Sequence, residues 1–266
     1  MEEHLAGLID CYTKDAPNYI VDRGPEFLEV TRPLIDRISV GDARAICDLG
    51  AGVGSLLPYI RERAPHALIV GTDLTAAMLE RAPKAFPLVA ADAEKPLFKL
   101  GSLDVVVSTF MFHHLRDLVG TLRIVRESLR KEGVFALMEW GEVERSPFHE
   151  IWSEELRHAG APEFSPKPQS NADIRAQMDS APKMGKLLRE GGFDVSDSDE
   201  IRWTRGRTVD EILELKDGPV ISKRLTALED SKQEACLDRV RRRVATLAPR
   251  HRDEISRVVW GVGVNP

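Results

Sequence analysis

The chain has 266 residues, of which 42% are hydrophobic and 30% are charged, and its formal net charge is −6. The length fits one large α/β domain with insertions, and the composition is that of a folded globular protein, which excludes a disordered chain. The acidic balance disfavours a nucleic acid as the partner because its phosphate backbone would be repelled. A small molecule is therefore the expected partner.

The N-terminus and the cysteines bear on the location of the protein. The first twelve residues, MEEHLAGLIDCY, are acidic where a signal peptide would be basic, and no apolar run approaches the roughly 18 residues needed to cross a bilayer. Cys11, Cys47 and Cys236 stand far apart without a CxxC pair, which suggests neither a disulfide framework nor a cysteine zinc site. We expect a cytoplasmic protein without a membrane span, with a homodimer as a candidate assembly.

Residues 1–40 precede the first apolar run and are expected to be helical. From residue 44 to residue 140, short apolar runs then alternate with amphipathic segments, which is typical of parallel strands joined by crossover helices. We expect strands at 44–49, 67–72, 86–90, 103–109 and 133–140, and helices at 55–63, 75–81 and 115–131. Thr75 is the expected N-cap of the second of these helices and Gly133 the stop after the third.

The composition changes after Trp140, where residues 141–182 carry five prolines and predict an inserted loop and helix. Further along, we expect a helix at 184–190, a partly exposed sixth strand at 193–204, a helical stretch at 208–247 and a last strand at 255–264. No internal repeat is evident.

A glycine-rich turn follows the first expected strand: residues 48–54 read DLGAGVG and open a helix. Glycine lets the chain bend tightly and lets a ligand approach the backbone, so the turn is a candidate nucleotide site. A dinucleotide fingerprint requires G-x-G-x-x-G, whereas Ser55 stands at the sixth position here. Asp48 would also repel a pyrophosphate but would attract an ammonium group. The phosphate-binding GxxxxGK[ST] motif is absent.

DLGAGVG resembles motif I of the class I S-adenosylmethionine-dependent methyltransferases of the small-molecule type, and residues 44–140 keep that family's order of motifs. The resemblance implies a doubly wound, mostly parallel, seven-stranded Rossmann-like sheet with helices on both faces and an antiparallel last strand. Residues 1–40 would form an N-terminal helical segment, and residues 41–266 one domain whose insertions at 141–182 and 205–254 form an acceptor lid. The implied reaction moves a methyl group from S-adenosyl-L-methionine to an oxygen, nitrogen or carbon atom of a small-molecule acceptor.

The resemblance also implies a set of cofactor-binding residues. Asp48, Gly50, Gly52 and Gly54 would line the methionine part, and Asp73, at the end of the second strand, would bind the ribose. Leu74, Met78, Asp92 and Ala93 would surround the adenine, and Ser108 and Tyr19 complete the expected set. The chemistry of Asp73 agrees, because a carboxylate can accept a hydrogen bond from both ribose hydroxyls, although Asp73 could also serve the start of the following helix. For Asp92 a helix cap is the equal alternative.

Methyl transfer is an in-line displacement at a cationic sulfonium, so the protein needs a base only if the acceptor must lose a proton. His113, in the segment STFMFHHL, is the candidate base, although it could instead begin the next helix. His113, His114 and Asp117 lack a clear set of metal ligands, so no metal is expected. Tyr12 and Tyr19 resemble an N-terminal aromatic element of small-molecule methyltransferases that closes over the cofactor.

The acceptor pocket is expected in the segments after residue 140. Its candidate walls are aromatic: Trp140, Phe148, Trp152, Phe164 and Trp203. The arginines between residues 239 and 243 are expected to form a solvated helix face balanced by acids. A nicotinamide-dependent reductase is the alternative enzyme, although its frequent Tyr-x-x-x-Lys pair is missing. A cofactor-binding scaffold without catalysis is the alternative from another class.

Overall fold

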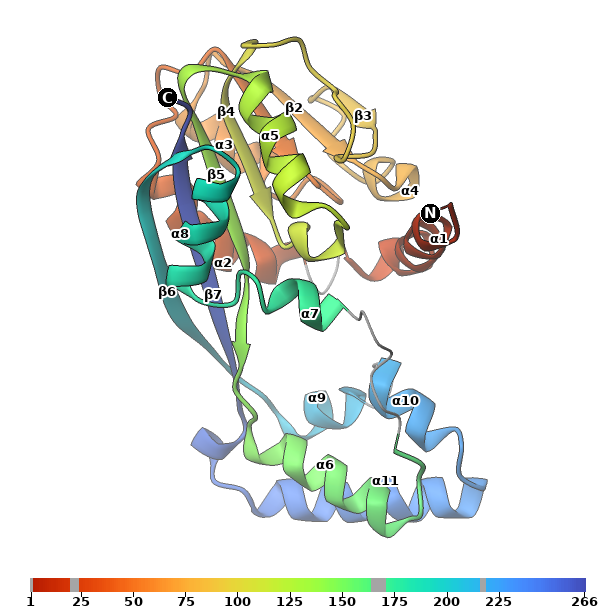
Figure 1. Ribbon diagram of the computed structural model, residues 1–266. Coiled ribbons are helices and arrows are strands. Elements are labelled where there is room, and N and C mark those ends of the chain that lie inside the picture. Colours follow the sequence, from red (N-terminus) through yellow and green to blue (C-terminus); the bar gives the residue numbers. More distant parts are fainter. Residues whose placement is uncertain (1, 20–23, 164–170, 216–218) are drawn as a thin grey trace. The chain divides into compact units, whose positions relative to one another are not determined.

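The computed structural model describes residues 2–19, 24–163, 171–215 and 219–266 (Figure 1). These residues divide into two compact units. The first comprises Met1–Gly141, Asn171–Ile201 and Val258–Pro266, and the second comprises Glu142–Ser170 and Arg202–Arg257. The assignment of residues 141–182 and 205–254 as an acceptor lid stays a prediction.

Seven strands form one sheet in the order β3-β2-β1-β4-β5-β7-β6. Their bounds are β1 Ala45–Leu49, β2 Leu68–Asp73, β3 Leu88–Ala90, β4 Leu103–Thr109, β5 Leu129–Val143, β6 Asp194–Gly206 and β7 Asp253–Val264. Adjacent strands from β3 to β5 are parallel. β7 is antiparallel to β5, because Asn265, just after β7, exchanges backbone hydrogen bonds with Glu132 and Gly133 near the start of β5. The predicted fold class is confirmed.

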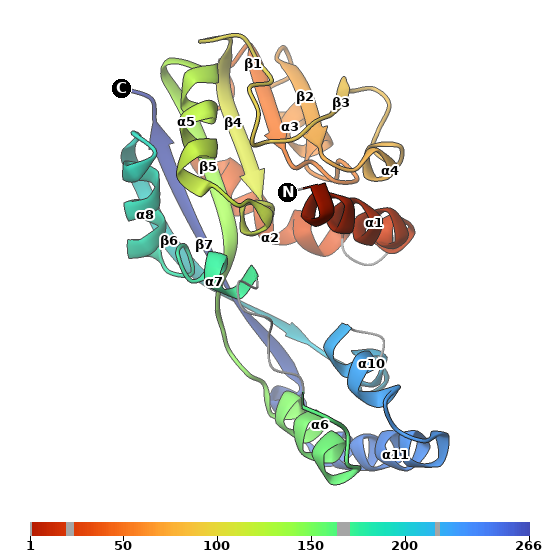
Figure 2. The same ribbon diagram turned by 45° about the vertical axis from the view of Figure 1, so that its right-hand side comes forward.

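The central strands are apolar in their middle parts because helices cover both faces of the sheet. Ile46 and Cys47 of β1 and Val107 of β4 have no exposed surface. Figures 1 and 2 show α5 (Leu118–Ser128) and α8 (Ala181–Glu190) on one face, and α2 (Gly24–Arg37) and α3 (Leu57–Arg63) on the other. α1 (Glu2–Asn18) lies at the carboxyl ends of the strands, in contact with α4 (Ala76–Leu79).

The third predicted helix is shorter than expected, and its predicted stop is wrong. α5 begins at Leu118 because the Asp117 side chain caps it, and it ends at Ser128. Leu129 already pairs with Leu103 of β4, and Gly133 lies inside β5. Pairing with β4 and β7 therefore overrides the helical pattern of residues 129–131. Thr75 does occupy the N-cap of α4, but its side chain makes no capping hydrogen bond.

The second unit is helical and has its own hydrophobic core. It contains α6 (Pro147–His158), α9 (Val209–Glu214), α10 (Pro219–Leu225) and α11 (Asp230–Thr246), so the predicted helical stretch at 208–247 is three helices. Phe148 and Trp152 of α6 pack there against Val240 and Val244 of α11. No helix in the described ranges is long and apolar enough to span a membrane.

Candidate cofactor site

A cavity of about 1180 Å³ of empty space, part of it at an open mouth, lies at the carboxyl ends of β1, β2 and β4. Its walls come from the turns after these strands, from the loop after β3 and from α1 and α2. The carboxyl ends of the strands are where ligands bind in open sheets of this type, so the cavity is the candidate ligand site.

The glycine turn after β1 forms the floor of this cavity. Gly50 and Gly52 have φ angles of +83° and +56°, a conformation that other residues rarely adopt. A Cβ on Gly50 would lie 2.5 Å from Cγ of Met111, so the turn has no room for a side chain there. The backbone N–H groups of Gly50 and Ala51 both donate to the carbonyl of Thr72, which ties the turn to the end of β2.

Gly54, the third glycine of the turn, is not among the lining residues of the cavity. Its φ is +71°, and a Cβ would lie 2.8 Å from the Cβ of Ala82, which follows α4. Gly54 therefore permits close packing beside the cavity, and its contact with the cofactor stays a prediction.

Asp48, at the end of β1, lines the cavity, yet only 2% of its surface is exposed. Its Oδ1 atom has no hydrogen-bond partner among the described residues. Burial, together with the nearby negative charge of Asp73, raises the pKa of Asp48 to about 7. Burying a charged carboxylate without a partner destabilises a protein, and a positively charged group of a ligand would remove that cost.

Asp73, at the end of β2, connects two parts of the site. Its Oδ2 accepts a hydrogen bond from the Gly52 N–H at 2.9 Å, and its Oδ1 accepts one from the Thr75 N–H at 2.8 Å. Burial raises the pKa of Asp73, and these two N–H donors oppose that effect. Each carboxylate oxygen has a further lone pair for a ligand hydroxyl. Asp73 thus binds the start of the following helix through Thr75, and its role in binding the ribose stays a prediction.

The predicted adenine-binding residues lie around the same cavity. Leu74, Met78, Asp92 and Ala93 all belong to its lining. The Oδ1 of Asp92 accepts a hydrogen bond from the Glu94 N–H at 3.0 Å, whereas its buried Oδ2 has no hydrogen-bond partner and lies 3.8 Å from Nζ of Lys95. Asp92 therefore forms a local turn and keeps an acceptor for a ligand.

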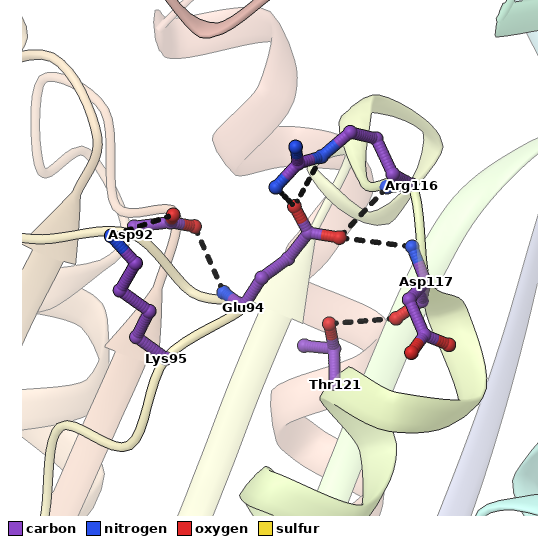
Figure 3. Close-up of polar contacts among 6 residues, drawn as sticks. All are labelled: Asp92, Glu94, Lys95, Arg116, Asp117 and Thr121. Carbon is purple, nitrogen blue, oxygen red and sulfur yellow. Dashed lines mark hydrogen bonds and ion pairs between the residues drawn. The ribbon is translucent and has the colours of Figure 1, made fainter. Parts of the chain in front are cut away.

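Glu94 fixes the loop after β3 to the segment that precedes α5 (Figure 3). Its Oε1 accepts from the backbone N–H groups of Arg116 and Asp117 at 3.0 and 2.9 Å, and its Oε2 accepts from Nε of Arg116 at 2.8 Å. These donors and the Arg116 charge outweigh burial and lower the pKa of Glu94. No pattern in the sequence indicates this role of Glu94, because its partners Arg116 and Asp117 lie 22 and 23 residues further along the chain.

Besides Gly54, two predicted site residues lie outside the cavity lining. Ser108 is fully buried, and its hydroxyl donates to the carbonyl of Leu49 at 2.8 Å, so it joins β4 to β1. His113 is also buried, with Nδ1 2.8 Å from Oε2 of Glu139, a side chain with no exposed surface. His113 therefore faces the interior beside β5 rather than the ligand.

The neighbouring His114 lines the cavity in place of His113. Both residues belong to the short helix η2 (Phe112–His114), which directs their side chains differently. His114 Nε2 and the Tyr12 hydroxyl share a hydrogen bond of 2.7 Å. Tyr12 and Tyr19 both line the cavity, with ring centroids 5.9 Å apart.

Of the aromatic residues predicted as acceptor-pocket walls, the four that the structure describes are not among the lining residues of this cavity: Trp140, Phe148, Trp152 and Trp203. Phe148 and Trp152 belong to the core of the second unit, and Trp140 stacks on Phe110, which does line the cavity, at 4.2 Å. Phe164 lies outside the described residues. The predicted basic face is an ion-paired one: Arg239 and Arg243 both bind Glu155, Arg243 also binds Glu154 and Arg241 binds Asp210.

The residues of the cavity fit the cofactor that the resemblance implies. S-adenosylmethionine presents an ammonium group, a carboxylate, two ribose hydroxyls and an adenine amine. Asp48 offers the ammonium group a carboxylate oxygen that has no hydrogen-bond partner among the described residues, and Asp73 offers the ribose hydroxyls spare lone pairs. Asp92 offers the amine an oxygen that has no hydrogen-bond partner among the described residues. When bound, the cofactor supplies an electrophilic methyl group on a sulfonium.

Comparison with known proteins finds similarity to methyltransferases. A family model described as a methyltransferase domain matches residues 47–137. The malonyl-[acyl-carrier protein] O-methyltransferase of Legionella pneumophila is 32% identical over 46% of this chain and 45% of its own length. The trans-aconitate 2-methyltransferase of an Azoarcus species is 30% identical over 54% of this chain and 59% of its own. The chain thus spans about half the length of these curated relatives.

A solved structure shares the fold over nearly the whole chain. A chain in the complex between the Haloferax volcanii Trm112 methyltransferase activator and the putative methyltransferase superposes with a TM-score of 0.56. The two chains are 17% identical, and the match covers 96% of this chain and 97% of the other. The matched residues 47–137 form a methyltransferase domain that includes the glycine turn and the strands that carry Asp48 and Asp73, within a seven-stranded sheet of the same fold as this solved structure.

Proposed function

We propose that the protein transfers the methyl group of S-adenosyl-L-methionine to an oxygen, nitrogen or carbon atom of a small-molecule metabolite. The observation that carries this proposal is Asp48, a buried carboxylate whose Oδ1 has no partner among the described residues and which borders a cavity closed below by the glycine turn. The named substrates of the two relatives, malonyl-[acyl-carrier protein] and trans-aconitate, support methyl transfer as the reaction class.

The proposed roles follow from the positions of the side chains. Asp48 pairs with the ammonium group of the cofactor, Asp73 accepts from the ribose hydroxyls, and Asp92 accepts from the adenine amine. The apolar side chains of Leu74 and Met78 exclude water from the adenine. Exclusion of water matters because the charge on a sulfonium disappears during transfer, so a dry site favours the transition state.

If the substrate must lose a proton before it receives the methyl group, Tyr12 and His114 are the groups proposed to take that proton. A ligand hydroxyl can donate to the Tyr12 oxygen while the Tyr12 proton moves to Nε2 of His114, 2.7 Å away. His113 is not placed for this role because it is buried and is not among the lining residues of the cavity. A general base of this kind typically contributes about 10²–10⁴-fold to a rate.

The proposal is tested in two steps. Calorimetry with S-adenosylmethionine and with its demethylated product establishes binding, and a panel of hydroxyl, amine and carbon acceptors is then screened for release of S-adenosylhomocysteine. Binding with turnover of at least one acceptor is expected. Binding without any turnover would favour a non-catalytic scaffold, and no binding at millimolar cofactor would refute the proposal.

A further inference from the structure

A continuous series of aromatic rings lines one wall of the cavity. His114 contacts Tyr12 with a centroid distance of 5.3 Å, and Tyr12 contacts Tyr19 at 5.9 Å. The series continues from Tyr19 to Phe27 at 5.8 Å and from Phe27 to Phe110 at 5.2 Å. All five rings belong to the cavity lining. Such a wall offers planar apolar surface, which favours a ligand that carries a ring.

The aspartates and glutamate in the described lining of the cavity are not matched there by lysine or arginine. These four acids are Asp48, Asp73, Asp92 and Glu94. Arg116 balances Glu94 from outside the lining, and Lys95 lies 3.8 Å from Asp92. No described cation is paired with Asp48 or Asp73.

This distribution of charge opposes an anionic acceptor. A carboxylate or phosphate would lose its hydration in the cavity without gaining a basic partner from the described lining. It would also be repelled by Asp73, whose hydrogen-bond partners among the described residues are the backbone N–H groups of Gly52 and Thr75. An uncharged acceptor avoids both costs.

One polar pair stands within the aromatic wall. Tyr12 and His114 share a hydrogen bond of 2.7 Å, and both rings line the cavity. A ligand hydroxyl is the group that fits this pair, because it can donate its proton to the Tyr12 oxygen. The rings therefore favour a planar body, and the polar pair favours a hydroxyl on that body.

We propose that the acceptor is an uncharged aromatic hydroxyl compound rather than a carboxylic acid or a phosphate. This inference rests on the proposed methyltransferase function and specifies its substrate class. The acceptor oxygen forms a bond to the methyl carbon while the carbon–sulfur bond breaks. The electron pair of that bond stays on sulfur, which becomes a neutral thioether, and the hydroxyl proton passes to the Tyr12–His114 pair.

The test compares two probes of matched shape, 2-naphthol and 2-naphthoate, on the full chain saturated with S-adenosylhomocysteine. Titration calorimetry should give 2-naphthol at least roughly a tenfold lower Kd, because naphthoate brings a charge that finds no partner. Equal or tighter binding of 2-naphthoate would overturn the inference, as would failure of both probes to bind at millimolar concentration. Saturation by S-adenosylhomocysteine is measured first, so failure at that step counts against the proposed function instead.

A lysine added to the cavity should reverse the preference. Leu28→Lys places a cation in the lining and is expected to lower the Kd of 2-naphthoate relative to 2-naphthol, and Leu8→Lys is the second variant if the first does not fold. Leu68→Lys is the matched control, because Leu68 is 56% exposed on β2 and does not line the cavity. The inference would be contradicted if Leu68→Lys reversed the preference for 2-naphthol over 2-naphthoate. It would also be contradicted if a cavity variant that folds and binds S-adenosylhomocysteine kept that preference.

Discussion

The replacement of Asp48 by asparagine should make the protein more stable at alkaline pH while weakening its function. Asp48 has a pKa of about 7 in the folded protein against an ordinary value of 3.8. Between these values the folded protein holds a proton that the unfolded chain has released, so the free energy of unfolding falls as pH rises towards 7. Above pH 7 the cost of the buried charge reaches about 4 kcal/mol, at about 1.4 kcal/mol per pH unit.

The asparagine side chain cannot ionise, so the Asp48→Asn variant avoids this cost. Its gain in stability over the wild type should grow by about 3 kcal/mol between pH 5 and pH 8. Urea unfolding at the two pH values measures this difference, and Asp42→Asn, which removes an exposed carboxylate, is the control. A gain that is the same at both pH values would refute the reasoning.

The same variant should lose affinity for the cofactor. A charge-assisted hydrogen bond contributes about 1.5–3 kcal/mol, so the Kd of S-adenosylmethionine should rise about tenfold or more at pH 8. Wild-type affinity should fall as the pH drops below about 7, because a protonated Asp48 no longer attracts the ammonium group. An affinity that does not change with pH in the wild type would contradict this role.

Three further predictions concern the other residues of the site. Asp73→Ala should raise the Kd of S-adenosylmethionine by about one to two orders of magnitude in calorimetry, because two charge-assisted bonds are lost, and an unchanged Kd would mean that the ribose site is misplaced. Glu94→Gln should raise the KM of the cofactor about threefold to tenfold with little change in kcat, because the loop after β3 loses its charged bonds to Arg116, whereas a change in kcat alone would argue against this positioning role. His114→Asn should lower kcat at least about 10²-fold and leave thermal unfolding near normal. His113→Asn should destabilise the fold by about 1–3 kcal/mol, because Glu139 loses a buried partner. The reverse pattern would indicate that His113 is the base.

Local sequence patterns were sufficient for the sheet and for one side of the cavity. Buried parallel strands are apolar throughout, and each acidic residue that the motifs indicated stands where a strand ends, so Asp48, Asp73 and Asp92 could be placed on the same edge. The sequence also indicates Gly50 and Gly52, because a tight turn at this place requires residues that can adopt positive φ angles.

The rest of the site depends on contacts between distant segments. Tyr12 meets His114 across 102 residues, and no pattern in the sequence indicates that pairing. The choice between adjacent histidines follows from the short helix η2 and from the buried Glu139, which holds His113. The early start of β5 likewise depends on β7, whose end bonds to Glu132 and Gly133.

A crystal structure of the protein with S-adenosylhomocysteine tests the central claim most directly. The account predicts the ligand above the glycine turn, with its ammonium group at Asp48, its ribose at Asp73 and its adenine near Asp92. A ligand bound elsewhere, or bound in the cavity with its ribose away from Asp73 and its ammonium group away from Asp48, would contradict the account.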